Sequence, residues 1–147
     1  AMDFRKAAII INKTPVHTPK TAELKLLPRY SAGHERELAA LMLETQQAMA
    51  RFAYEMVEAG PWWLWVSGIG ELGPRGIFRP WAETLTQLCQ SGSPEVQERI
   101  LLFRHFSMNQ FSIAYRQAGS IAAASPQDAL QLLLRIGTAN RRSILGF

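Results

Sequence analysis

The residues whose types and spacing most resemble a chemical motif form a glycine-rich stretch, Gly68-Ile69-Gly70-Glu71-Leu72-Gly73. It matches G-x-G-x-x-G, in which backbone N–H groups at a helix N-terminus bind a pyrophosphate. An apolar run precedes it, as a strand would, but Pro74-Arg75-Gly76 follows at once. Because no alternation of strands and helices is predicted around the motif, we expect a tight loop and no nucleotide cofactor.

The remaining reactive residue types are scattered. Cys89 is the only cysteine, which excludes an internal disulfide and a zinc site built from several thiolates, and its apolar neighbours predict a buried side chain. No histidine has a glutamate three residues before it, so the Glu-x-x-His pattern of di-iron bundles is absent. The sequence therefore predicts no catalytic residue, no metal site and no cofactor.

The most informative stretch is Gly60-Pro61-Trp62-Trp63-Leu64-Trp65-Val66, which holds three of the four tryptophans. It has three interpretations: a structural hinge, a contact surface for a lipid, polymer or partner protein, or a small-ligand pocket. Since neighbouring side chains diverge on a helix or strand, we expect at least one of the three rings to be partly exposed. The predicted binding residues are Trp62, Trp63, Leu64, Trp65, Val66, Phe78 and Trp81.

Helical patterns predict the elements that carry this stretch, in one helical domain over residues 31–147. A first amphipathic helix ends at Gly60-Pro61, and its apolar stripe is predicted to be core. That stripe consists of Leu38, Leu41, Met42, Thr45, Met49, Phe52, Ala53 and Met56.

Three further helices are predicted from their start signals. One begins at Pro80, one runs from Ser93-Pro94-Glu95 to about Ile121, and one begins at Ser125-Pro126. The third of the four helices has three apolar stripes, which predict a central position in a bundle or self-association, most simply as a dimer. The expected fold class is all-α: three to four amphipathic helices in a small bundle with an extended N-terminal arm.

That arm covers residues 1–30 and is basic. The chain has a formal charge of +4, and positive charge gathers in the arm and at Arg135, Arg141 and Arg142, which leaves the middle acidic. The ends either contact an anionic partner or serve solubility and lie against the chain's own acidic helix. The apolar residues Ala7 to Ile11 are expected to form a short strand or an anchor. No leader and no apolar run of 18 residues is present, so a soluble, cytoplasmic protein without a transmembrane segment is expected.

The alanine-rich stretch Ala118 to Ala124 and the helix start Ser125-Pro126-Gln127-Asp128-Ala129-Leu130-Gln131-Leu132 resemble the C-terminal part of bacterial phasins, over about residues 94–142. The resemblance implies a helical, non-catalytic protein that coats polyhydroxyalkanoate granules through apolar helix faces. The leading interpretation is accordingly a non-catalytic binding protein that coats an apolar surface or acts as a helical adaptor. The alternative is an oligomeric regulatory or accessory subunit that binds a partner protein or an anionic ligand through its arm. The expected partner is an apolar polymer or lipid surface or a protein, with homo-oligomerisation; nucleic acid is not favoured.

Overall fold

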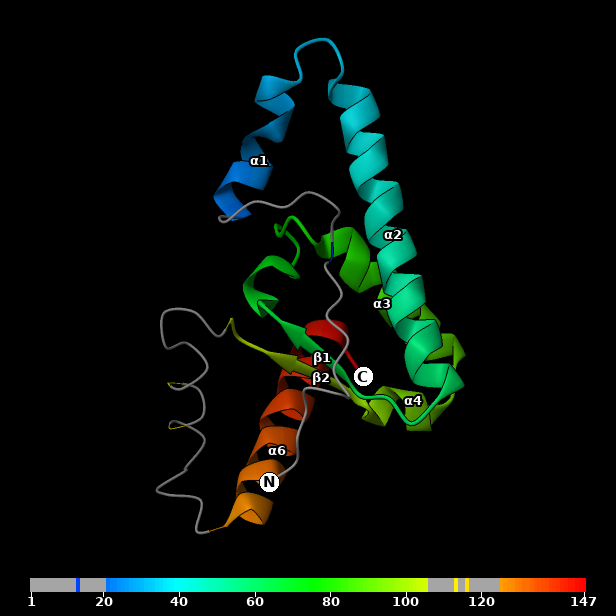
Figure 1. Cartoon of the computed structure of the whole chain (residues 1–147), viewed down its shortest axis with the longest axis vertical. Coiled ribbons are helices and arrows are strands. Elements are labelled where there is room, and N and C mark those ends of the chain that lie inside the picture. The colour runs from blue at the N-terminus through cyan, green and yellow to red at the C-terminus, as the bar shows by residue number, and fades with distance from the viewer. Residues whose placement is uncertain (1–12, 14–20, 106–112, 114–115, 117–124) are drawn as a thin grey trace.

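The computed structural model describes residue 13, residues 21–105, residues 113 and 116, and residues 125–147 (Figure 1). Over these residues the chain is mostly helical, as expected, and contains a small parallel sheet. In chain order the elements are α1 (Thr21–Tyr30), α2 (Glu35–Ala59), β1 (Leu64–Ser67), the 3₁₀ turn η2 (Ile69–Glu71), α3 (Arg79–Ser91), α4 (Pro94–Glu98), β2 (Ile100–Phe103) and α6 (Pro126–Leu145).

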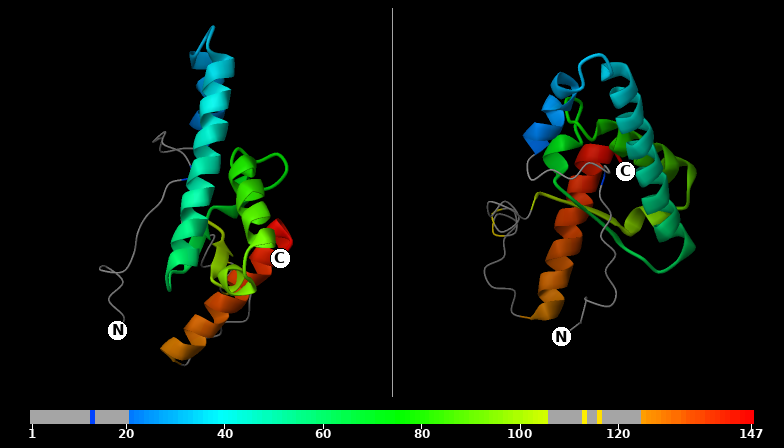
Figure 2. Two further views of the ribbon diagram at one scale, coloured as in Figure 1. Left: turned by 90° about the vertical axis from the view of Figure 1, so that its right-hand side faces the viewer. Right: turned by 45° about the horizontal axis from the view of Figure 1, so that its top comes forward.

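The two strands lie side by side and parallel, with Leu64 opposite Ile100 and Ser67 opposite Phe103. A parallel pair needs a crossover connection, which α3 and α4 provide. One face of the sheet, formed by Leu64, Val66, Ile100 and Leu102, belongs to the hydrophobic core shared with α2 and α3. Figures 1 and 2 show α6 against the strands and away from α2, while α1 and the first half of α2 project as a hairpin.

A glycine allows α6 to pack closely on the second face of the sheet. A Cβ atom at Gly137 would lie 2.7 Å from Leu101 Cβ and 2.9 Å from the Phe103 ring, so only a residue without a side chain fits. Nearby, Asn140 Nδ2 donates to the Leu102 carbonyl at 2.9 Å. Both contacts fix α6 against β2, whose four residues are all buried.

The helix start signals are confirmed. The Ser93 hydroxyl accepts a hydrogen bond from the Val96 N–H, and the Ser125 hydroxyl accepts one from Asp128 N–H, so both serines are N-caps with proline in the first turn. The helix expected at Pro80 begins one residue earlier and buries Trp81, Leu85 and Cys89.

Two predictions of the fold are wrong in part. The helix expected from Pro94 to about Ile121 is interrupted, because α4 ends at Glu98 and Ile100–Phe103 is a strand buried on both faces. Residues 113 and 116 are helical, and the rest of the range from 106 to 121 lies outside the described residues. The arm expected to be extended to residue 30 contains α1 from Thr21 onward. The predicted anchor at Ala7 to Ile11 lies outside the described residues.

The prediction for the stripe of α2 is also wrong for Leu41 and Phe52, which are exposed, while its other residues are half-buried or buried. The buried residues of this helix are Gln46, Ala50, Ala53, Tyr54 and Val57, which lie about 100° around the helix from the predicted stripe. Of the stripe only Ala53 is buried, while Leu41 is 56% exposed and Phe52 is 44% exposed. Met49 is half-buried and packs against the core, whereas Phe52 stays exposed.

None of the helices described is both long enough and apolar enough to cross a membrane.

Candidate interaction surface

The three clustered tryptophans all reach the surface. Trp62 is 39% exposed, Trp63 is 49% exposed and Trp65 is 44% exposed. We refer to these three residues as the tryptophan surface. The expectation that at least one ring is partly exposed agrees with these values, while a binding role remains a prediction.

Strand geometry separates the tryptophans from their apolar neighbours. Successive side chains of a strand point to opposite faces, and in β1 Leu64 and Val66 join the core while Trp65 lies between them on the other face. The Trp65 ring lies 5.1 Å from the Phe103 ring, centroid to centroid, at an interplanar angle of 45°. Trp65 therefore packs against Phe103 on this face of the sheet and remains 44% exposed.

Arg99 fixes the backbone that carries Trp62 and Trp63. Its guanidinium donates to the carbonyl oxygen of Gly60 and, at 3.4 Å, to that of Trp62. The Arg99 carbonyl in turn accepts a hydrogen bond from Leu64 N–H at 2.9 Å. Both ends of the short connection between α2 and β1 are thus held by one residue, so the indoles are presented from an ordered backbone.

Gly60 provides the space for the first ring. A Cβ atom at this position would lie 2.9 Å from Trp62 Cδ1, so the Trp62 indole folds back over the C-terminal end of α2. This contact shields part of Trp62 and makes it the least exposed of the three rings.

The three tryptophan side chains together expose a substantial area to solvent. At roughly 250 Å² for each tryptophan, the exposed parts together present about 330 Å². This sum counts each ring separately, Trp62 and Trp63 on the connection between α2 and β1 and Trp65 on β1.

The remaining predicted binding residues do not join that surface. Val66 and Trp81 are each 3% exposed and lie in the core, while Leu64 and Phe78 are half-buried against it. The predicted set therefore divides into an exposed group of tryptophans and a group whose main contacts are with the protein itself.

Phe78 and Trp81 instead accommodate a lysine of the N-terminal region. Lys13 Nζ donates to the Ser67 carbonyl at 2.6 Å and lies 5.3 Å from the Phe78 ring centroid and 5.9 Å from that of Trp81. Burial lowers the pKa of Lys13 to about 8, although the carbonyl and the ring faces favour a charged ammonium. This lysine binds its own chain at the carboxyl end of β1.

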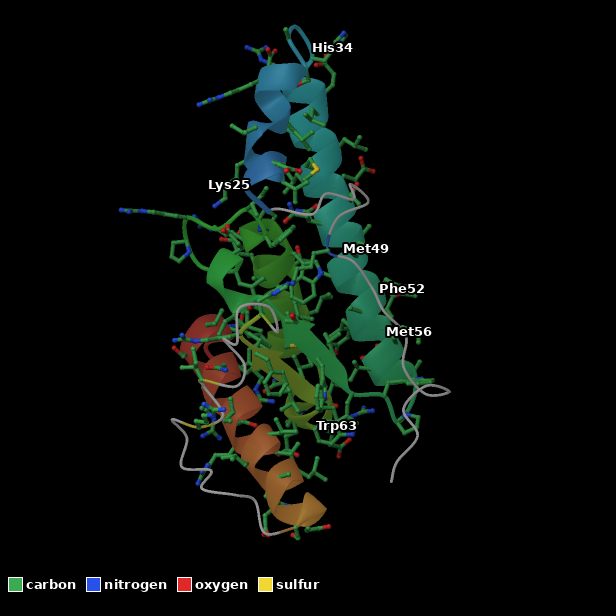
Figure 3. All side chains as sticks on the ribbon, turned by 60° about the vertical axis from the view of Figure 1, so that its left-hand side comes forward. Lys25, His34, Met49, Phe52, Met56 and Trp63 are labelled. Carbon is green, nitrogen blue, oxygen red and sulfur yellow. The ribbon has the colours of Figure 1, made fainter. Side chains whose placement is uncertain are left out.

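A second exposed apolar region lies on α2. Figure 3 shows Met49, Phe52 and Met56 following one another along this helix, with Trp63 below its C-terminal end. Phe52 is 44% exposed, and the two methionines are half-buried. Methionine and phenylalanine side chains adapt to irregular apolar partners, so this side of α2 is a second candidate contact.

The glycine-rich motif has a different setting from the one expected. It follows β1 in a parallel β-α-β unit, so the prediction that no such alternation surrounds it is wrong. However, only the three-residue turn η2 opens inside the motif, and α3 begins six residues after it, at Arg79. Gly68 has a φ of +81°, whereas a Cβ atom at Gly70 or Gly73 would meet nothing within 4 Å. The motif forms a loop, as predicted, and does not present a helix N-terminus.

The other residues considered for a reactive or ligand-binding role, Cys89 and Arg141, are buried within the fold. Cys89 is fully buried, and burial raises the pKa of its thiol to about 12, so it stays protonated at neutral pH. Arg141, counted among the basic ends, is 5% exposed and donates to the carbonyl oxygens of Gln97, Ile100 and Phe147. Burial also lowers the pKa of Arg141, and this residue is not presented to an anionic partner. Within the described ranges no three of the His, Cys, Asp and Glu side chains are grouped to hold a metal ion.

No family model matches the chain, and no curated protein and no solved structure shows significant similarity to it.

Proposed function

We propose that this chain is a non-catalytic binding protein that attaches to an apolar surface through Trp62, Trp63 and Trp65. The observation that carries the proposal is the exposure of all three indoles on a backbone held by Arg99. Tryptophan is favoured at boundaries between water and apolar matter because a large apolar ring carries one polar N–H group. The surface-coating role implied by the resemblance to phasins is the specific form of this proposal.

The expected strength of attachment follows from the exposed area. Burying about 330 Å² at roughly 25 cal/mol per Å² gives about 8 kcal/mol. Association costs about 4–15 kcal/mol in lost freedom, so the tryptophan surface alone supports weak and reversible attachment. Additional contact through Phe52 and its neighbours on α2 would strengthen it.

A partition experiment tests the proposal. The protein is mixed with polyhydroxybutyrate particles, the particles are sedimented, and bound protein is measured between about 0.05 and 0.5 M salt. We expect saturable binding with little salt dependence, and a loss of at least fivefold in affinity for Trp63→Ala. Leu41→Ala is the matched control, because Leu41 is 56% exposed but lies 18 residues before Ala59, about 27 Å along α2. Equal losses in the two variants, or no binding by the wild type, would contradict the proposal.

The exposed residues of α2 favour a second candidate function, a helical adaptor that forms an oligomer. Leu41 and Phe52 are 56% and 44% exposed on one long helix, and a second copy of the chain would cover such a face. Light scattering at tens of micromolar tests this candidate. A dimer that dissociates in Phe52→Glu supports it, and a monomeric wild type refutes it.

A further inference from the structure

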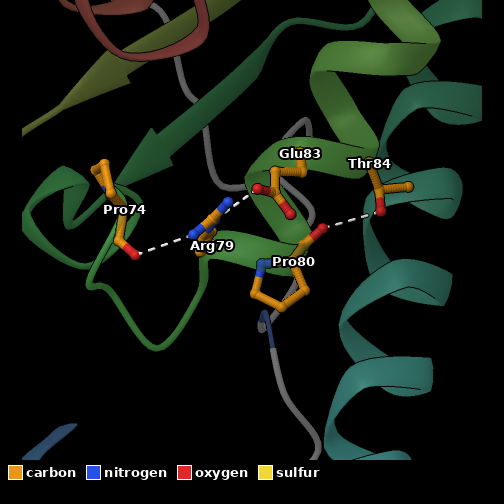
Figure 4. A network of polar contacts seen from close by, with 5 residues as sticks. All are labelled: Pro74, Arg79, Pro80, Glu83 and Thr84. Carbon is orange, nitrogen blue, oxygen red and sulfur yellow. Dashed lines mark hydrogen bonds and ion pairs between the residues drawn. The ribbon is translucent and has the colours of Figure 1, made fainter.

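The core side of α2 is occupied by a helix of the same chain. Ala50 and Ala53 of α2 belong to the same hydrophobic core as Leu85 of α3. Figure 4 shows α3 beside α2, and the Thr84 hydroxyl on this side of α3 donates to the Pro80 carbonyl at 2.9 Å. The core side of α2 is therefore closed to a further partner.

The opposite side of α2 carries a second set of apolar side chains. At about 100° per residue, Leu41, Ala48 and Phe52 lie roughly half a turn around the helix from Ala50 and Ala53. Leu41 is 56% exposed and Phe52 is 44% exposed, and Ala48 between them is also exposed. We refer to this side of the helix as the outer stripe.

The spacing along the outer stripe is that of a helix that pairs with another helix. In such pairs the contact positions alternate steps of three and four residues. From Leu38 onward, these steps pass through Leu38, Leu41, Thr45, Ala48, Phe52, Glu55 and Ala59. Of these seven, Thr45 and Glu55 are polar, and the Thr45 hydroxyl already donates to the Leu41 carbonyl at 2.7 Å. The outer stripe therefore offers about 18 residues, from 38 to 55, to a second helix.

A second copy of α2 matches this stripe when it runs antiparallel. If the pair is centred between residues 46 and 47, Leu41 of each copy lies opposite Phe52 of the other copy, and Thr45 lies opposite Ala48. The large exposed side chains then meet each other, and the small ones lie at the centre, where the two backbones approach. Since Leu41 and Phe52 are about 16 Å apart along the helix, one such contact lies on either side of the centre.

Charge favours the same alignment. Glu44 and Arg51 are exposed along one edge of the outer stripe, two turns apart, and neither belongs to an ion pair among the described residues. In the antiparallel pair each Glu44 lies within about one turn of Arg51 of the other copy, and symmetry makes this contact twice. In a parallel pair this edge would face the edge that carries Met49 and Met56, and the opposite charges would not meet.

The ends of the pairing are less favourable. Glu37 of one copy lies near Glu58 of the other, and Glu55 lies opposite Leu38. Glu37, Glu55 and Glu58 are exposed, so water and salt screen the repulsion. These ends limit the contact to its central part, and a short contact of this kind gives a reversible dimer.

We infer that α2 pairs with α2 of a second copy in an antiparallel contact centred between residues 46 and 47. This inference rests on the second candidate function, the oligomeric adaptor, and gives the partner and the geometry of its contact. Leu41 and Phe52 supply the apolar contacts, and Glu44 and Arg51 set the orientation.

Charge reversal tests the contact. The dissociation constant of the dimer is measured by sedimentation equilibrium at about 0.05 M salt, where exposed charges are weakly screened. Glu44→Arg and Arg51→Glu should each weaken the dimer about fivefold, because each turns two attractive pairs into repulsive ones. The double variant that carries both changes should recover the wild-type affinity. Arg36→Glu is the matched control, because Arg36 is exposed on the same helix but lies away from the outer stripe. Unchanged affinity in the single variants, or no recovery in the double variant, would overturn the inference.

Cysteine cross-linking tests the orientation. Thr45→Cys and Ala48→Cys are mixed and oxidised, and Cys89 does not interfere because it is fully buried. An antiparallel pair should join the two variants to each other faster than it joins either variant to itself, and a parallel pair should give the reverse. A dimer that shows the parallel pattern would overturn this inference alone, whereas a monomeric wild type would refute the adaptor function together with it.

Discussion

Replacing Trp63 and, separately, Trp81 by alanine tests whether the tryptophan segment serves as a contact surface or as part of the structural core. Trp63 is 49% exposed and Trp81 is 3% exposed. About half of the roughly 250 Å² of Trp63 is therefore shielded, which at about 25 cal/mol per Å² sets an upper limit near 3 kcal/mol. Alanine retains part of that burial, and the unfolded chain is already partly collapsed, so we expect Trp63→Ala to lower the free energy of unfolding by about 1–2 kcal/mol.

Trp81→Ala should cost more, because it leaves a cavity in the core between α2 and α3. Truncations of this kind typically cost about 3–5 kcal/mol. Since 1 kcal/mol corresponds to about 2–4 °C in a domain of this size, the Tm should fall by roughly 10 °C in Trp81→Ala and by less than about 5 °C in Trp63→Ala.

Urea unfolding followed by circular dichroism at 222 nm measures both variants. Parallel m values would show that the change lies in stability and not in the denatured state. If Trp63→Ala destabilised the protein as strongly as Trp81→Ala, the tryptophan segment would be a structural hinge and the contact hypothesis would be wrong.

Three further predictions concern the residues that hold the fold. Arg99→Met removes hydrogen bonds to two carbonyl groups of the tryptophan segment and should cost about 1–3 kcal/mol in urea unfolding; no loss would show that Arg99 does not fix the segment. Gly137→Val places a side chain 2.7 Å from Leu101 Cβ and should cost at least about 1–3 kcal/mol, whereas Ala139→Val on the exposed side of α6 should cost less than about 1 kcal/mol. The ¹³Cε shift of Lys13 should titrate with a midpoint near 8. Between about pH 8 and 10.5 the unfolded chain binds more protons at this lysine than the folded chain does, so Lys13 should make the free energy of unfolding rise with pH over that range. A midpoint above 10 would exclude burial of this ammonium.

The helix boundaries with strong local signals were predictable from sequence. Ser93-Pro94 and Ser125-Pro126 combine a capping hydroxyl with a proline in the first turn, and both serines cap as expected. The strand β2 was missed because a run of four apolar residues, Ile100–Phe103, fits a buried strand and a segment of an apolar helix equally well. Only its pairing with β1, some 36 residues earlier, distinguishes the two.

The buried face of α2 illustrates a different limit. The 3.6-residue period identifies an apolar stripe, but it does not say which neighbour a helix meets. The contact with α3 uses Ala50 and Ala53, whose small side chains carry little hydrophobic signal. As a result Phe52 remains 44% exposed, although it belongs to the stripe that sequence reasoning assigned to the core.

For the candidate site, the exposure of the indoles followed from their spacing, but the contacts that position them did not. Arg99 lies 37 and 39 residues from the carbonyls that it holds, and no sequence pattern joins such positions. The burial of Gln46 could not be predicted from the sequence either, because a glutamine in a helix is ordinarily a surface residue. Long-range hydrogen bonds, unlike caps, depend on the assembled fold.

The most direct test of the tryptophan surface is a fluorescence measurement on Trp81→Phe, in which Trp62, Trp63 and Trp65 are the only indoles that remain. Their emission should be typical of exposed rings in the free protein, because all three are at least 39% exposed. On addition of polyhydroxybutyrate particles, we expect the emission maximum to shift to shorter wavelength and the rings to become protected from acrylamide quenching. Sedimentation of the protein with the particles while emission and quenching stay unchanged would show that attachment uses another part of the molecule.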